Sequence, residues 1–81
     1  MNKNEIYKKI NKFYIEINES LKQYEKAGYA SSELNKLCDE VWHYMNHFSS
    51  MVNTKDELIT STKVIKKMQE EFQKIKSELE E

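Results

Sequence analysis

The chain of 81 residues contains no proline and one glycine, Gly28. These two residue types form most tight turns, because proline fixes φ at about −65° and glycine reaches positive φ without strain. A β-protein needs many such turns, and a phosphate-binding loop needs several glycines. The composition therefore predicts an all-α protein and excludes a glycine-rich nucleotide loop.

The first predicted helix covers residues from about 3 to 27. Apolar and aromatic residues recur in it at seven-residue spacing, in adjacent columns that indicate one broad buried stripe. The columns are Ile10, Ile17 and Tyr24; Ile6 and Phe13; and Tyr7, Tyr14 and Leu21. Asn2 and Glu5 have the spacing of a capping box at its start, and Gly28 is placed to end it.

Two further helices are predicted, over residues from about 32 to 52 and from about 55 to 80. Ser31 or Ser32 caps the first of them, and Thr54 with Glu57 has capping-box spacing before the second. The last helix has the strictest pattern, which is typical of the a and d positions of a coiled coil. Its two columns are Leu58, Ile65, Phe72 and Leu79, and Ser61, Met68 and Ile75.

These helices predict an antiparallel three-helix bundle, formed by a single helical domain over residues 1–81. The second break contains neither glycine nor proline, and the apolar column of Leu37, Tyr44 and Met51 continues in phase to Leu58. A long helical hairpin that dimerises into a four-helix bundle is therefore the alternative. The three-helix bundle is favoured because residues 49–54 are rich in weak helix formers.

One pattern has the spacing of metal ligands. Glu40 and His43 form a Glu-x-x-His motif, and His47 follows one turn later, so that all three lie on one helical face. This face is opposite the apolar columns, and a carboxylate-bridged site needs more ligands than the chain supplies. We therefore expect a solvated face and neither a metal nor another cofactor. A metal-binding helical bundle is the second alternative function.

Other chemistry is not expected from this sequence. Cys38 falls on an apolar column, where a free cysteine usually acts as a small buried hydrophobe, and no nucleophilic triad is evident, so we predict no enzyme. Nucleic-acid binding is not expected because the chain has no arginine and a net charge of −1.

No apolar run approaches the roughly 18 residues that span a bilayer, so we expect no membrane insertion. A single cysteine suits a cytoplasmic protein.

Apolar residues outside the stripes point to binding of another protein. The four candidates for partner binding are Tyr29, Trp42, Ile59 and Val64. Tryptophan and tyrosine are enriched at the hot spots of protein interfaces, so these residues favour a protein partner, with a homodimer as a further option.

Abundant lysine, asparagine and isoleucine without arginine are typical of an AT-rich genome, such as that of a low-GC bacterium or its phage. The sequence therefore predicts a small non-enzymatic protein that docks a helical face on a partner, as an inhibitor, an immunity- or antitoxin-like protein or an escort factor. The first alternative is a coiled-coil module that assembles homo-oligomers through its last helix.

Overall fold

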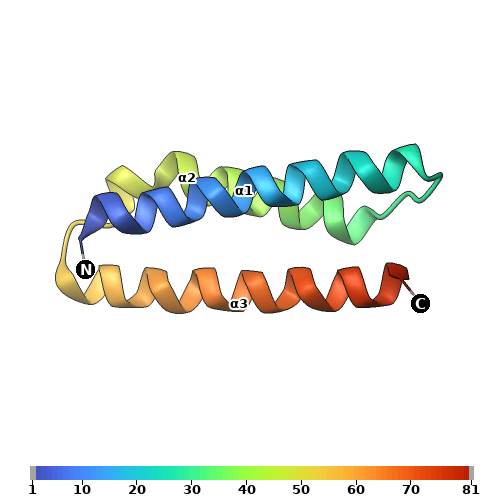
Figure 1. Ribbon diagram of the computed structural model, residues 1–81. Helices are drawn as coiled ribbons and strands as arrows, with labels where there is room; N and C mark the ends of the chain where they lie inside the picture. Colours follow the sequence, from blue (N-terminus) through green and yellow to red (C-terminus); the bar gives the residue numbers. More distant parts are fainter. Residues whose placement is uncertain (1, 81) are drawn as a thin grey trace.

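The computed structural model describes residues 2–80 and contains three helices joined by two short connections. Helix α1 covers Lys3–Lys26, α2 covers Ser32–Met51 and α3 covers Lys55–Glu80. Helix α2 runs antiparallel to the other two (Figure 1), every pair of helices is in contact, and the bundle is 43 Å long. The predicted three-helix bundle is confirmed, with helix ends within one residue of those expected from the sequence.

Gly28 ends α1 as predicted. It has a φ of 88°, which a residue with a Cβ atom rarely adopts. The N–H of Tyr29 donates to the carbonyl of Tyr24 at 2.8 Å, and the N–H of Gly28 donates to the carbonyl of Glu25 at 3.1 Å. The ring of Tyr29 also packs edge-on against that of Tyr24, at 6.4 Å between centroids. These contacts make a Schellman motif, which satisfies the last carbonyls of the helix.

Side-chain caps begin the first two helices at the predicted residues. The side-chain oxygen of Asn2 accepts a hydrogen bond of 2.9 Å from the N–H of Glu5. The hydroxyl of Ser31 accepts one of 3.1 Å from the N–H of Leu34. Each cap satisfies one of the backbone donors that the start of a helix leaves unpaired.

The second turn forms without glycine or proline. The carboxylate of Glu57 accepts hydrogen bonds from the backbone N–H groups of Asn53 and Thr54, at 3.2 and 3.1 Å. The hydroxyl of Thr54 accepts in return from the N–H of Glu57 at 3.2 Å. This is a complete capping box. Val52, in an extended conformation just before it, is buried at 3% exposure and anchors the turn to the core.

Lys3 adds a contact between the start of α1 and the end of α2. Its ammonium group donates to the carbonyl of Ser49 at 2.8 Å, one of the carbonyls that the last turn of a helix leaves unpaired. Capping side chains and Lys3 therefore stabilise the break that the sequence marks weakly. The alternative of a long helical hairpin is wrong, because the chain reverses direction between α2 and α3.

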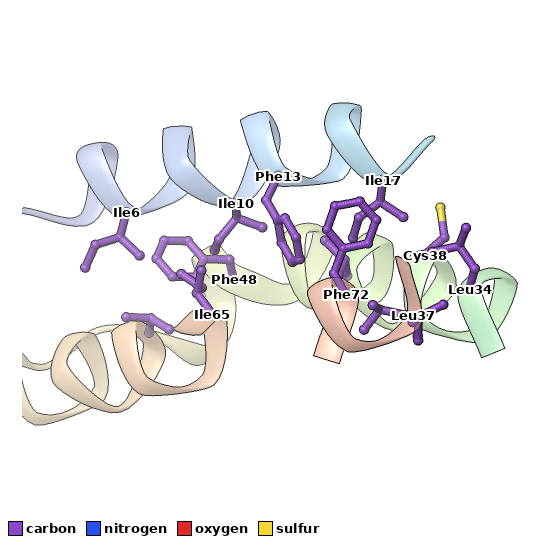
Figure 2. Packing of buried hydrophobic residues seen from close by; sticks show 13 residues of the cluster. Ile6, Ile10, Phe13, Ile17, Leu34, Leu37, Cys38, Phe48, Ile65 and Phe72 are labelled. Atoms are coloured by element: carbon purple, nitrogen blue, oxygen red, sulfur yellow. The ribbon is translucent and has the colours of Figure 1, made fainter. Parts of the chain in front are cut away.

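Apolar side chains from all three helices meet along the axis of the bundle (Figure 2). At its centre the rings of Phe13 and Phe72 pack edge to face, with centroids 5.8 Å apart. The core consists of Ile6, Ile10, Phe13, Ile17, Leu34, Leu37, Cys38, Val41, Phe48, Val52, Ile65, Phe72 and Ile75. Because the coiled-coil pattern of α3 is packed against α1 and α2, its central residues are not free to bind a second chain.

Two residues of the predicted apolar columns are exposed. Tyr7 is 38% exposed and Met51 is 43% exposed. Tyr7 lies at the edge of the α1 stripe. Its ring packs against that of Phe48, with centroids 6.1 Å apart, and its other side faces solvent. Met51 is the last residue of α2, so no further helical turn covers it.

Candidate functional site

Three helices in a bundle have three outer faces, one along each pair of helices. Tyr7 packs against Phe48 of α2, whereas Phe13 packs against Phe72 of α3. The Tyr7 side of α1 therefore faces α2, and the Phe13 side faces α3.

The face along α1 and α2 contains a column from each helix without charged residues. On α1 the column is Asn4, Asn11 and Asn18, and on α2 it is Asn35, Trp42 and Ser49, each at seven-residue spacing. Asn4 and Tyr7 lie across from Phe48 and Ser49, because these residues line one hollow of about 590 Å³. We call these two columns, together with Tyr7 and Met45, the uncharged face. Lys3 marks one end of it.

Large apolar side chains are exposed on the uncharged face. Trp42 is 45% exposed and Tyr7 is 38% exposed, while Ile15, on the outer edge of the face, is 49% exposed. Because α1 and α2 are antiparallel and Lys3 is level with Ser49, Asn11 lies close to the level of Trp42. Trp42 and Asn11 therefore mark the middle of the face. The indole packs edge-on against the ring of His43, with centroids 5.3 Å apart.

The face along α1 and α3 contains a hollow lined by more lysines than carboxylates. This hollow of about 600 Å³ between the two helices has Phe13 and Ile65 at its floor and Lys9, Lys12 and Lys66 around it. The other lining residues are Glu16, Thr62 and Gln69. We call this hollow the basic groove.

The face along α2 and α3 holds the candidate metal ligands. Glu40, His43 and His47 line a shallow hollow of about 370 Å³ together with Tyr44, Met51 and Met68. The Nδ1 atom of His47 lies 2.8 Å from the carbonyl oxygen of His43, within the same helix. Within residues 2–80, no three His, Cys, Asp or Glu side chains are grouped closely enough to hold a metal ion. Glu40, His43 and His47 thus share a surface without forming such a group.

The four predicted partner-binding residues lie on different parts of the bundle. Tyr29 is 52% exposed in the connection between α1 and α2, and Trp42 lies on the uncharged face. Ile59 is 39% exposed and precedes Lys66 by seven residues, which places it on the α1 and α3 side. Val64 is half-buried and lies one helical turn from Ser61 and Met68, which are next to α2, so it is on the flank of α3 that faces α2. The structure does not bring these four side chains together.

The apolar columns of the sequence do not by themselves reveal the uncharged face. Its signal was present in the sequence as asparagines at seven-residue spacing, Asn4, Asn11 and Asn18. A surface column without charge is informative in a chain in which 33% of the residues are charged.

Cys38 is a core residue, at 8% exposure. Burial, and then the negative charge of Asp39, raise the pKa of its thiol. The thiolate, which is the reactive form, is therefore disfavoured.

Within residues 2–80, no helix combines the length and the apolar character needed to cross a membrane. No protein family, curated protein or solved structure shows significant similarity to this chain.

Proposed function

We propose that this chain is a small, non-enzymatic binding protein whose uncharged face docks on an uncharged, partly apolar surface of another protein. The observation that carries this proposal is the exposed indole of Trp42 in the middle of the uncharged face, which has the charged Lys3 only at one end. Burying a charge without a partner costs much free energy, and the central parts of interfaces are depleted of charge and enriched in aromatic residues.

The dimensions of the face suit a protein interface. Residues 4–18 of α1 and 35–49 of α2 each extend over about 21 Å at 1.5 Å per residue. Hot spots lie near the centre of an interface, as Trp42 does here, and asparagine side chains around it can donate and accept hydrogen bonds. A partner that matches this face presents apolar side chains surrounded by uncharged polar groups.

Docking of this kind requires no chemistry from the protein itself. It suits an inhibitor, an immunity- or antitoxin-like protein or an escort factor, which acts by covering a surface of its partner. We place this role in the cytoplasm of a low-GC bacterium or its phage, on the grounds of the lysine-rich, arginine-free composition and the single cysteine.

Affinity capture with matched truncations tests the proposal. Trp42→Ala and Ile59→Ala each remove an exposed apolar side chain, one on the uncharged face and one on the α1 and α3 side. We expect the Trp42→Ala variant to lose capture of the partner from host cells. The melting temperature of this variant should differ little from that of the wild type. The Ile59→Ala variant should capture the partner as well as the wild type does. Loss of stability in Trp42→Ala with unchanged capture per folded molecule would identify Trp42 as a structural residue instead.

A homo-oligomeric assembly module is the second candidate, because a face without charge does not repel a second copy of itself. The coiled-coil pattern of α3 does not serve this role, since its central residues are buried within the bundle. Light scattering over a range of concentrations separates the two candidates. A monomer at micromolar concentration supports a different protein as the partner, and a dimer that Trp42→Ala dissociates supports self-association.

A further inference from the structure

The basic groove combines an apolar floor with a positively charged rim. Phe13 and Ile65 are 4% and 5% exposed, so only small parts of their side chains reach the groove. The groove has a volume of about 600 Å³, within the range of roughly 300 to 1,000 Å³ that is usual for small-molecule sites.

The charge around the groove differs in sign from that of the whole chain. The lining contains three lysines and one carboxylate, that of Glu16. The chain as a whole has a net charge of −1. Lysine side chains are flexible, and their apolar stems can cover a ligand while the ammonium groups remain at its polar end. Because two helices contribute these lysines, the ammonium groups can approach an anion from both sides.

We propose that the basic groove binds a small amphiphilic anion, of which a fatty-acid carboxylate is the model. The alkyl chain contacts the exposed edges of Phe13 and Ile65 together with the methylene stems of the lysines. The carboxylate lies among the ammonium groups of Lys9, Lys12 and Lys66. Gln69 lies on the α3 side of the groove, and its side-chain amide can donate a further hydrogen bond to the anion. The hydroxyl of Thr62, also on this side, donates to the carbonyl of Ile59. A neutral or cationic amphiphile of the same length lacks the attraction to the lysines.

Amide chemical shifts measured during titration with decanoate, below its micelle concentration, test this proposal. We expect saturable shifts at Thr62, Ile65, Lys66 and Gln69, and much weaker ones with decanol or decyltrimethylammonium. The double variant Lys12→Gln/Lys66→Gln should bind decanoate about tenfold more weakly. The matched variant Lys36→Gln/Lys74→Gln removes two exposed charges outside the groove and should bind like the wild type.

Three results would overturn the proposal. The first is equal binding of the anionic, neutral and cationic amphiphiles, and the second is a set of shifts that maps to another face. The third is binding only to micelles or to vesicles of phosphatidylglycerol, which would indicate a lipid surface as the ligand instead of a single molecule. Thermal unfolding of each variant shows whether it is folded under the titration conditions.

Discussion

The phenol of Tyr44 donates a hydrogen bond to the hydroxyl of Ser61 over 2.7 Å, and this contact joins α2 to α3. Ser61 is 1% exposed and is the buried polar side chain of the described core, whereas Tyr44 is half-buried. Within residues 2–80, no buried side-chain nitrogen or oxygen lacks a hydrogen-bond partner. The pair therefore places a polar group in the core at a small net cost.

Removing one member of this pair should be more costly than removing both. Tyr44→Phe leaves the Ser61 hydroxyl buried without its partner and should lower the free energy of unfolding by about 1–2 kcal/mol. Ser61→Ala should cost less, because the phenol of Tyr44 can reach water. The double variant should be more stable than the sum of the single effects predicts, by at least about 0.5 kcal/mol in urea unfolding. Additive effects would show that the two hydroxyls do not interact.

The end of α1 depends on the backbone conformation of Gly28. No heavy atom lies within 4 Å of the position of an added Cβ, so Gly28→Ala meets strain but no clash. Because φ is 88°, we expect Gly28→Ala to lower the free energy of unfolding by about 1 kcal/mol. Gly28→Asn should cost less, since asparagine tolerates this conformation better than alanine does. If the wild type, Gly28→Ala and Gly28→Asn were equally stable in urea unfolding, the end of α1 would not depend on the positive φ of Gly28.

The capping box before α3 makes stability depend on pH. The hydrogen bond from the Asn53 backbone, then those from Thr54, and the nearby charge of Lys3 lower the pKa of Glu57. A carboxyl with a lowered pKa in the folded state stabilises the fold above its unfolded pKa of about 4.3, and this contribution disappears as the pH falls through the folded value.

Glu57→Gln isolates the charge, because glutamine can still accept these hydrogen bonds. We expect the wild type to melt at a higher temperature than Glu57→Gln at neutral pH. The difference should shrink once the pH falls below the unfolded pKa of about 4.3 and disappear as it falls through the lower pKa of Glu57 in the folded protein. A difference in melting temperature that does not change with pH would show that the charge of Glu57 contributes nothing.

Cys38 should react slowly with thiol reagents in the folded protein. Burial limits access to its sulfur, and the raised pKa of the thiol keeps the thiolate scarce. We expect dithionitrobenzoate to react at least about tenfold more slowly with the native protein than with the urea-unfolded chain. Reaction at similar rates would place Cys38 at the surface.

Local signals in the sequence predicted the ends of the helices well. Gly28, Asn2 and Thr54 act through hydrogen bonds to residues close in the sequence, so spacing alone identifies them. The exposure of Tyr7 and Met51 could not be predicted in this way, because it depends on how far neighbouring helices cover the edge of each apolar stripe.

The candidate site was only partly predictable, for a related reason. Trp42 was identified as an exposed aromatic residue, but its neighbours on the face depend on which flank of α1 packs against α2. The same packing places Ile59 with Lys66 on the α1 and α3 side and separates it from Trp42. Only the assembled bundle shows that the asparagines of α1 and the column of Trp42 share one face.

Binding through the uncharged face can be tested with two isosteric substitutions, one on this face and one in the basic groove. Asn11→Asp places one negative charge near Trp42, and Gln69→Glu places one in the basic groove, without a change in side-chain shape. Both residues are exposed, so both variants should fold. The measurement is the affinity for the captured partner. We predict that Asn11→Asp weakens it at least about tenfold, the cost of burying an unpaired charge, while Gln69→Glu leaves it unchanged. Equal affinities of Asn11→Asp and the wild type would show that the partner does not bind through the uncharged face.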